Sequence, residues 1–109
     1  MLADVPIDAS INKQEIFGPV AALSRFDTEA EAIARANDTQ LGLSAYIFIK
    51  DTTRGFRVAI ESGLIALNRG LVSDPAAPFG GVKQNGLGRE GGLHGIYEFL
   101  EAKYIATSI

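Results

Sequence analysis

The 109-residue sequence contains no cysteine. Disulfides, thiolate metal sites and cysteine nucleophiles are therefore excluded within these residues. Histidine is nearly absent as well: His94, the only one, has no second ligand or nucleophile beside it in the sequence. We therefore expect His94 at the surface, and the sequence predicts no metal site.

An excess of basic residues and long apolar runs are also missing. The net charge is −3 and the pI is near 5.0, without the clustered Lys and Arg that nucleic acids or anionic membranes require. No apolar run approaches the ~18 residues of a membrane span, and Met1 is followed by "LADVPID" rather than a basic and then apolar leader. We expect a soluble cytoplasmic protein with neither a nucleic acid nor a membrane as partner.

The first half of the chain predicts a strand followed by a helix. The short apolar run Val20–Phe26 is typical of a strand. Thr28 then precedes "EAEAIARAND", with Glu31 three positions further on, which is the pattern of a capping box. A helix that begins there places apolar residues on one face.

The next segment predicts a second helix between two buried strands. The run "SAYIFIK" (44–50) is almost continuously apolar, as in a strand covered on both faces. Asp51 is a candidate N-cap for a helix over 52–62, which we expect Gly63 to end. The run Leu64–Asn68 then predicts another strand. The order β-α-β-α-β indicates an α/β fold with a parallel sheet and right-handed crossover helices.

Beyond this core the composition changes. Eight of the twelve glycines fall between Gly70 and Gly95, which favours a long ordered loop, and such loops are often functional. Apolar residues then recur at helical spacing, at Leu93, Ile96, Tyr97 and Leu100. The last segment, 103–108, predicts a strand with an unpaired edge.

The stretch "GLGREG" (Gly86–Gly91) has the G-x-G-x-x-G spacing of dinucleotide-binding loops. That motif functions between a strand and a helix of a βαβ unit, with an acidic residue about 20 positions later. Here a loop precedes it, and the remaining residues leave no room for a further βα unit. We therefore interpret the glycines as a close-packed loop rather than a pyrophosphate site.

Four blocks resemble, in the same order, the C-terminal part of the NAD(P)-dependent aldehyde dehydrogenases. They are "EIFGPV" (Glu15–Val20), "NDTQLGLSAYIF" (Asn37–Phe48), "PFGGVKQNGLGRE" (Pro78–Glu90) and "YEFLEAKYIA" (Tyr97–Ala106). The resemblance covers essentially the whole chain. The stretch "NRGLVSDPAAPFGGVKQ" is similar in particular to the succinate-semialdehyde dehydrogenase branch.

The resemblance implies oxidation of an aldehyde, with succinic semialdehyde favoured, to its acid by NAD or NADP. In the family a cysteine thiolate attacks the aldehyde, hydride passes to the nicotinamide, and a glutamate activates the hydrolytic water. Both residues lie upstream of the "EIFGPV" segment in the family. The resemblance therefore implies a fragment that is inactive alone and has the missing N-terminal portion and a small aldehyde as partners.

The resemblance also implies a division of the chain. Residues 1–85 correspond to the second half of the catalytic domain, residues 86–101 to a glycine-rich loop and helix, and residues 102–109 to an oligomerisation strand of a homo-oligomer. The choice between NAD and NADP stays open, because the adenosine-ribose contacts of the family lie outside these residues.

Five site residues follow from the resemblance. Glu15 corresponds to the glutamate that accepts hydrogen bonds from the nicotinamide ribose, and Phe17 flanks the nicotinamide. Glu90 corresponds to a second carboxylate relay near the catalytic thioester. Phe79 lines the substrate tunnel, and Ser73 helps to grip the far carboxylate of the substrate, where arginines from upstream carry most of the charge recognition.

Four of these residues also have an ordinary structural interpretation. Glu15 can be a solvated acid before a turn, Phe17 and Phe79 core aromatics, and Glu90 a helix N-terminal acid favoured by the macrodipole. A function of another class also remains open: a non-catalytic α/β binding or assembly module that keeps the fold without the chemistry.

Overall fold

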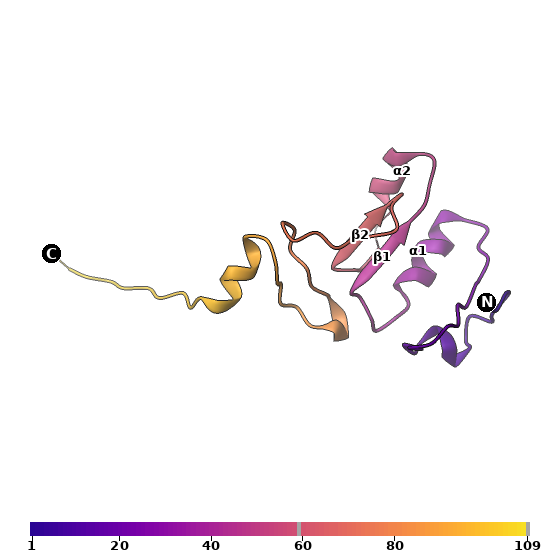
Figure 1. Ribbon diagram of the computed structural model, residues 1–109, viewed down its shortest axis with the longest axis horizontal. Coiled ribbons are helices and arrows are strands. Elements are labelled where there is room, and N and C mark those ends of the chain that lie inside the picture. Colours follow the sequence, from indigo (N-terminus) through magenta and orange to yellow (C-terminus); the bar gives the residue numbers. More distant parts are fainter. Residues whose placement is uncertain (59, 109) are drawn as a thin grey trace.

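The computed structural model describes residues 1–58 and 60–108, which form two α-helices, two strands and three short 3-10 helices (Figure 1). The α-helices and strands are α1 (Glu29–Asn37), β1 (Ser44–Ile47), α2 (Thr52–Arg57) and β2 (Leu64–Leu67). The 3-10 helices are η1 (Ser10–Asn12), η2 (Lys83–Asn85) and η3 (His94–Phe99).

The two strands form a parallel sheet, with Ser44 opposite Leu64 and Ile47 opposite Leu67. Parallel neighbours need a crossover connection, and α2 lies in the segment that provides it. Among the described residues the buried hydrophobic core consists of Leu64 and Ala66, both on β2. The α/β class predicted from the sequence is confirmed.

Local capping explains where α1 begins. The Thr28 hydroxyl accepts a hydrogen bond from the Glu31 amide at 3.2 Å, as predicted. The Glu31 carboxylate reaches back to the amide of Asp27, at 2.8 Å, one residue before the cap. Arg35 in the last turn pairs with Glu31 at 2.5 Å. The side chains of Thr28 and Glu31 thus satisfy two backbone amides at the start of α1, one inside the helix and one just before its cap.

The second helix is shorter than predicted. Asp51 caps it as expected, with its Oδ1 accepting from the Arg54 amide at 3.1 Å. The prediction that Gly63 ends this helix was wrong, because the backbone already becomes extended at Val58 (φ −68°, ψ 111°). The predicted helical position at Ala59 lies outside the described residues.

The strands are also shorter than predicted. β1 ends at Ile47 because the next pairing positions are taken by a side chain: the Asn68 amide accepts from the Ile49 N–H and donates to its carbonyl, both at 2.8 Å. The predicted strand Val20–Phe26 was wrong. Only one isolated parallel bridge forms in that segment, between Leu2 and Ala22.

The C-terminal predictions were corrected too. The helix expected around Leu93–Leu100 is the 3-10 helix η3, and the described residues of the predicted strand 103–108 form no strand. A strand needs a neighbour to bond with, and Figure 1 shows this tail extending away from the folded part of the chain. His94 is exposed, as predicted.

Much apolar surface is left uncovered. The accessible surface is 8717 Å², whereas a compact protein of 11.6 kDa exposes about 5,800 Å². The radius of gyration is 18.3 Å, against about 13 Å for a compact domain of this length. The prediction that β1 is covered on both faces was wrong for this chain, since Tyr46 is 47% and the adjacent Phe48 71% exposed.

Candidate functional site

Ser73, Phe79 and Glu90 line one pocket of about 300 Å³, together with Asp74, Pro75, Ala77 and Gly91. The backbones of Phe79 and Glu90 pair as an antiparallel bridge. The Phe79 amide donates to the Glu90 carbonyl at 2.7 Å, and the Glu90 amide donates to the Phe79 carbonyl at 2.8 Å. The structure thus brings together three of the five predicted site residues. We call the segment that this pair closes, 79–90, the site hairpin.

Arg89 and a glycine hold the site hairpin closed. One guanidinium nitrogen of Arg89, Nη1, donates to the carbonyls of Gly81 at 2.7 Å and of Leu87 and Gly88 at 2.9 Å. Gly80 permits this close approach, because a Cβ there would lie 2.2 Å from the Gly88 carbonyl oxygen. Any side chain at position 80 would force the two arms of the hairpin apart.

The Ser73 pocket is acidic. Glu90 and Asp74 both line it, and its lining contains no Lys or Arg. The Asp74 Oδ1 already accepts from the Ala76 amide at 2.9 Å. Ser73 supplies a hydroxyl, which donates one hydrogen bond. A cation that paired with an anion in this pocket would therefore come from outside this lining.

Glu15 and Phe17 lie elsewhere. Glu15 is exposed and lines a separate cavity of about 300 Å³, which also contains Ser62 and Asn85. The Ser62 hydroxyl oxygen is buried there without a hydrogen-bond partner. Phe17 is 90% exposed and has a left-handed backbone (φ 46°). The structure therefore places two of the five predicted residues away from the Ser73 pocket.

A further cavity of about 430 Å³ lies next to both of these regions. Its lining includes Phe79 and Glu90 of the site hairpin and also Asn85 and Leu43, which line the Glu15 cavity as well. Asn85 thus lines both the Glu15 cavity and this further cavity, but not the Ser73 pocket. The sequence analysis missed this residue, and its only signal was its place inside the glycine-rich block "GGVKQNG".

The "GLGREG" stretch has a different setting from a dinucleotide-binding loop. Gly86, with φ 86°, follows the 3-10 helix η2 rather than a strand. The next helix is η3, also 3-10, and no α-helix begins after Gly86 in residues 86–108. The strand, loop and α-helix order that seats a pyrophosphate is not formed by these residues.

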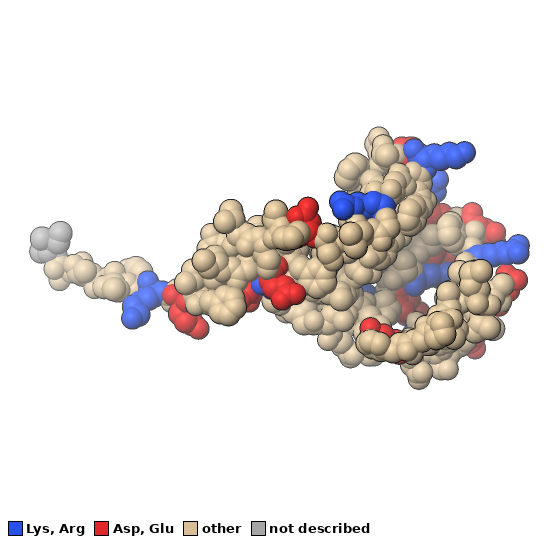
Figure 2. Space-filling model, viewed as in Figure 1, with Lys and Arg blue, Asp and Glu red and all other residues tan. Residues whose placement is uncertain are grey.

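Charges of both signs are distributed over the molecule. In the view of Figure 2, blue and red side chains alternate around the folded end, and tan surface lies between them. The best-defined cluster joins the helices: Glu29 of α1 bonds Arg54, and it lies 3.1 Å from Arg57 of α2. The hydrogen bond from Arg54 is the largest cause that lowers the pKa of Glu29. Desolvation, the next largest cause, opposes it, and Arg57 lowers the pKa further.

Residues 1–58 and 60–108 show neither a metal site nor a membrane-spanning helix. Within them no group of three acidic or histidine side chains is placed to hold a metal ion. In the same residues no helix has both the length and the apolar character needed to cross a bilayer.

The sequence matches the aldehyde dehydrogenase family over residues 1–105. The chain therefore belongs to the aldehyde dehydrogenase family. Its sequence is 50% identical over 111 aligned positions to the succinate-semialdehyde dehydrogenase [NADP(+)] GabD of Escherichia coli, covering 100% of this chain and 23% of that protein. It is also 50% identical over 111 positions to the glutarate-semialdehyde dehydrogenase of Pseudomonas putida, again over 100% of this chain and 23% of the relative.

Solved structures agree with this assignment. An NADP-dependent enzyme of E. coli superimposes with a TM-score of 0.89 at 51% identity, covering 94% of this chain and 22% of that chain. An aldehyde dehydrogenase of Mycobacterium tuberculosis complexed with NAD+ gives a TM-score of 0.84 at 38% identity, over 95% of this chain and 23% of that chain. The chain thus spans between a fifth and a quarter of the length of these relatives.

Proposed function

We propose that this chain forms part of an enzyme that oxidises an aldehyde with a distal carboxylate to the diacid, using NAD or NADP. Succinic semialdehyde is the substrate we favour, and glutaric semialdehyde is its nearest competitor. The observation that carries the proposal is the 50% identity, along the whole chain, to semialdehyde dehydrogenases that act on these two substrates by name. The pocket that gathers Ser73, Phe79 and Glu90 supports it.

The catalytic nucleophile and the general base come, in this proposal, from polypeptide outside these residues. The sequence has no cysteine to supply a thiolate. The uncovered apolar surface, with Phe17 90% and Phe99 88% exposed, is what a segment leaves open when it packs against further polypeptide. We accordingly assign residues 1–85 to a catalytic domain, 86–101 to its loop and helix, and 102–109 to an oligomerisation strand.

The residues present fit the nicotinamide end of the cofactor. Glu15 is exposed at a cavity, and an ionised carboxylate can accept from both hydroxyls of a ribose diol. The exposed Phe17 ring is free to flank a planar ring. When bound, the nicotinamide supplies the hydride acceptor. Glu15 and Phe17 orient that end, and residues 86–91 lack the strand and α-helix of a pyrophosphate seat.

Within the pocket each residue has a separate role. The Ser73 hydroxyl donates to the distal carboxylate of the substrate, and arginine from outside the lining balances its charge. The half-buried Phe79 ring forms the apolar wall along the aldehyde chain. We assign to the Glu90 carboxylate the relay of a proton near the acyl group, and the backbone pairing of Glu90 with Phe79 supports this role.

The alternative is a non-catalytic binding or assembly module. The absence of cysteine favours it for the isolated chain. It predicts that the chain is stable and monodisperse alone, whereas the proposed function predicts that the chain needs additional polypeptide to cover its apolar surface.

A hybrid enzyme separates the two. In it, the part of the E. coli enzyme that this chain matches is replaced by the present sequence. We expect reduction of NADP with succinic semialdehyde within about tenfold of the E. coli enzyme. The control is the E. coli enzyme without the replaced part, for which we expect no turnover. A folded, cofactor-binding hybrid with no turnover on either semialdehyde would contradict the proposed function.

A further inference from the structure

The tip of the site hairpin is attached to the loop that leads from α1 to β1. The Val82 amide donates to the Gly42 carbonyl at 3.0 Å, and the Gln84 amide donates to the Gln40 carbonyl at 3.0 Å. Gly42 is buried at this contact, and a Cβ there would lie 2.7 Å from a methyl carbon of Val82. The two segments are far apart in sequence, so this contact decides where the hairpin lies.

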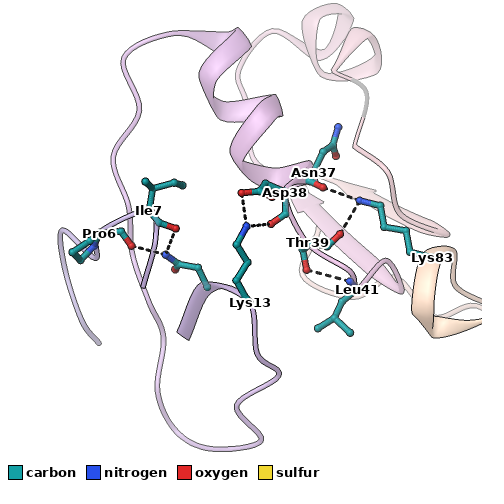
Figure 3. A network of polar contacts seen from close by, with 9 residues as sticks. Pro6, Ile7, Lys13, Asn37, Asp38, Thr39, Leu41 and Lys83 are labelled. Carbon is teal, nitrogen blue, oxygen red and sulfur yellow. Dashed lines mark hydrogen bonds and ion pairs between the residues drawn. The ribbon is translucent and has the colours of Figure 1, made fainter. Parts of the chain in front are cut away.

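Lys83 fastens the same tip to the end of α1. Its Nζ donates to the carbonyls of Asn37 at 2.8 Å and Thr39 at 3.1 Å (Figure 3). The same Nζ lies 2.8 Å from Oε2 of Glu61. The ammonium group has three N–H donors, one for each of these three oxygen atoms. The Lys83 side chain is only 23% exposed, and its backbone is in the left-handed region (φ 55°). A non-glycine residue keeps that conformation only where its surroundings hold it.

Asn85 makes the third attachment. Its Oδ1 accepts from the Gly42 amide at 2.6 Å. The same residue lines the Glu15 cavity and the cavity beside Phe79 and Glu90. The contact between Asn85 and Gly42 therefore borders both of these cavities.

The attachments act on the site through the hairpin. Arg89 ties its arms together, and the Phe79–Glu90 pair closes its base, so the hairpin is stiff between tip and base. Because the hairpin is stiff, contacts that fix the position of its tip also fix the position of its base. Release of the tip would leave Phe79 and Glu90 paired with each other but free to shift relative to Glu15.

We propose that Lys83 and Asn85 are positioning residues that set the Phe79–Glu90 pair at a fixed place relative to the Glu15 cavity. The inference rests on the proposed function, in which Glu15 orients the nicotinamide and Phe79 and Glu90 contact the substrate. Lys83 lines none of the three cavities described above, and the Asn85 side-chain oxygen is engaged with the Gly42 amide. Both act through the hairpin, since a small misplacement of reacting groups reduces the rate strongly.

The kinetic test uses the hybrid enzyme with Lys83→Met, Asn85→Ala and Asn85→Asp. We expect the first two to lower kcat about tenfold or more while the Kd for NADP stays within about twofold. Asn85→Asp keeps an accepting oxygen for the Gly42 amide, so we expect it to restore most of the rate. Lys50→Met is the matched control, because Lys50 is exposed and removing its charge leaves the hairpin intact.

A second measurement is independent of turnover. Amide hydrogen exchange in the hybrid enzyme, which needs no turnover, follows the Val82 and Gln84 amides. We expect them to exchange at least about tenfold faster in Lys83→Met and Asn85→Ala, with α1 amides unchanged. Unchanged protection at both amides, or equal kcat losses in Asn85→Asp and Asn85→Ala, would overturn the inference. A hybrid that is inactive before any substitution refutes the proposed function instead, and the exchange data then decide alone whether the tip is held.

Discussion

Phe79 and Glu90 hydrogen-bond to each other in both directions, with N···O distances of 2.7 and 2.8 Å. The two residues are eleven positions apart in the sequence, and their backbone pairing holds them next to each other in the candidate pocket. Ser73 reaches the same pocket from outside the hairpin. Substitution of its side chain therefore tests recognition without disturbing the pair.

Replacing Ser73 by alanine in the hybrid enzyme removes one hydroxyl donor. We expect KM for succinic semialdehyde to rise by about 2- to 10-fold, the equivalent of one net hydrogen bond, with a smaller change for an uncharged aldehyde of similar length. Steady-state kinetics with both aldehydes measure the difference. Equal changes for the two substrates would contradict the carboxylate role, and Ser73→Thr, which keeps the hydroxyl, is the control.

Glu15→Gln tests the other region. The amide keeps the shape of the side chain but loses the charge and one accepting oxygen. Because a hydrogen bond to a charged group contributes about 1.5 to 3 kcal/mol, we expect turnover of the hybrid to fall roughly 10- to 100-fold. The control is Glu101→Gln, in the exposed segment after η3. Unchanged kinetics in Glu15→Gln would remove this residue from the cofactor site.

Features that depend on nearby residues could be predicted from the sequence. The N-caps of α1 at Thr28 and of α2 at Asp51 each depend on a residue three positions further on, and both were predicted. The parallel pairing of β1 and β2 followed from the helix between them. Strand ends could not be predicted, because they depend on distant groups: Asn68 takes the bonds of Ile49, and the tail has no neighbour to pair with.

The same distinction applies to the candidate site. Ser73, Phe79 and Glu90 could be named from the family resemblance, and the structure gathers them in one pocket. Their joint placement depends on contacts that no local pattern shows. Lys83 reaches the end of α1 across 46 residues, and Asn85 reaches Gly42 across 43. A lysine and an asparagine between glycines give no periodic or motif signal for such contacts.

The Glu29 cluster predicts a pH dependence of stability. Arg54, followed by Arg57, lowers the pKa of Glu29 below its ordinary value of 4.5. A carboxyl whose pKa is lowered on folding stabilises the fold above the unfolded pKa, and this contribution is lost as pH falls through the folded pKa. We expect Glu29→Gln to lower the urea midpoint at about pH 7 and to have little effect well below the folded pKa.

The pH dependence of the urea midpoint is measured by urea unfolding at several pH values, followed by circular dichroism. Arg54→Gln should show the same pH trend as Glu29→Gln, because it removes the partner with the largest effect on the carboxyl. Glu101→Gln is again the control. A Glu29→Gln deficit that is constant across the acidic range would contradict the assigned cause.

The C-terminal tail predicts a contact with another subunit. Tyr104 is 90% and Ile105 74% exposed, and the described residues 103–108 pair with no strand of this chain. Extended apolar and β-branched segments bind by edge addition to a neighbouring sheet. We expect deletion of residues 104–109 to lower the mass of the hybrid in light scattering. The same oligomer before and after deletion would contradict the role, and a Tyr104→Ser, Ile105→Ser variant of full length tests whether the apolar side chains are responsible.

The 109-residue chain alone should neither oxidise aldehydes nor bind NAD tightly. Oxidation by the family chemistry needs a thiolate, and the chain has no cysteine. Tight binding of a dinucleotide depends largely on a pyrophosphate seated at a helix N-terminus, and Gly86–Gly91 lies between two 3-10 helices without the strand and α-helix of such a seat. Glu15 and Phe17 would hold only the nicotinamide end.

Calorimetric titration with NAD and an assay with succinic semialdehyde measure both properties of the isolated chain. We expect no saturable binding in the micromolar range and no NADH formation. Adding the complementary N-terminal portion of the E. coli enzyme should cover the exposed apolar surface and restore turnover. Micromolar binding by the chain alone would show that "GLGREG" or another part of these residues does seat the pyrophosphate, since a nicotinamide contact through Glu15 and Phe17 offers too few groups for that affinity.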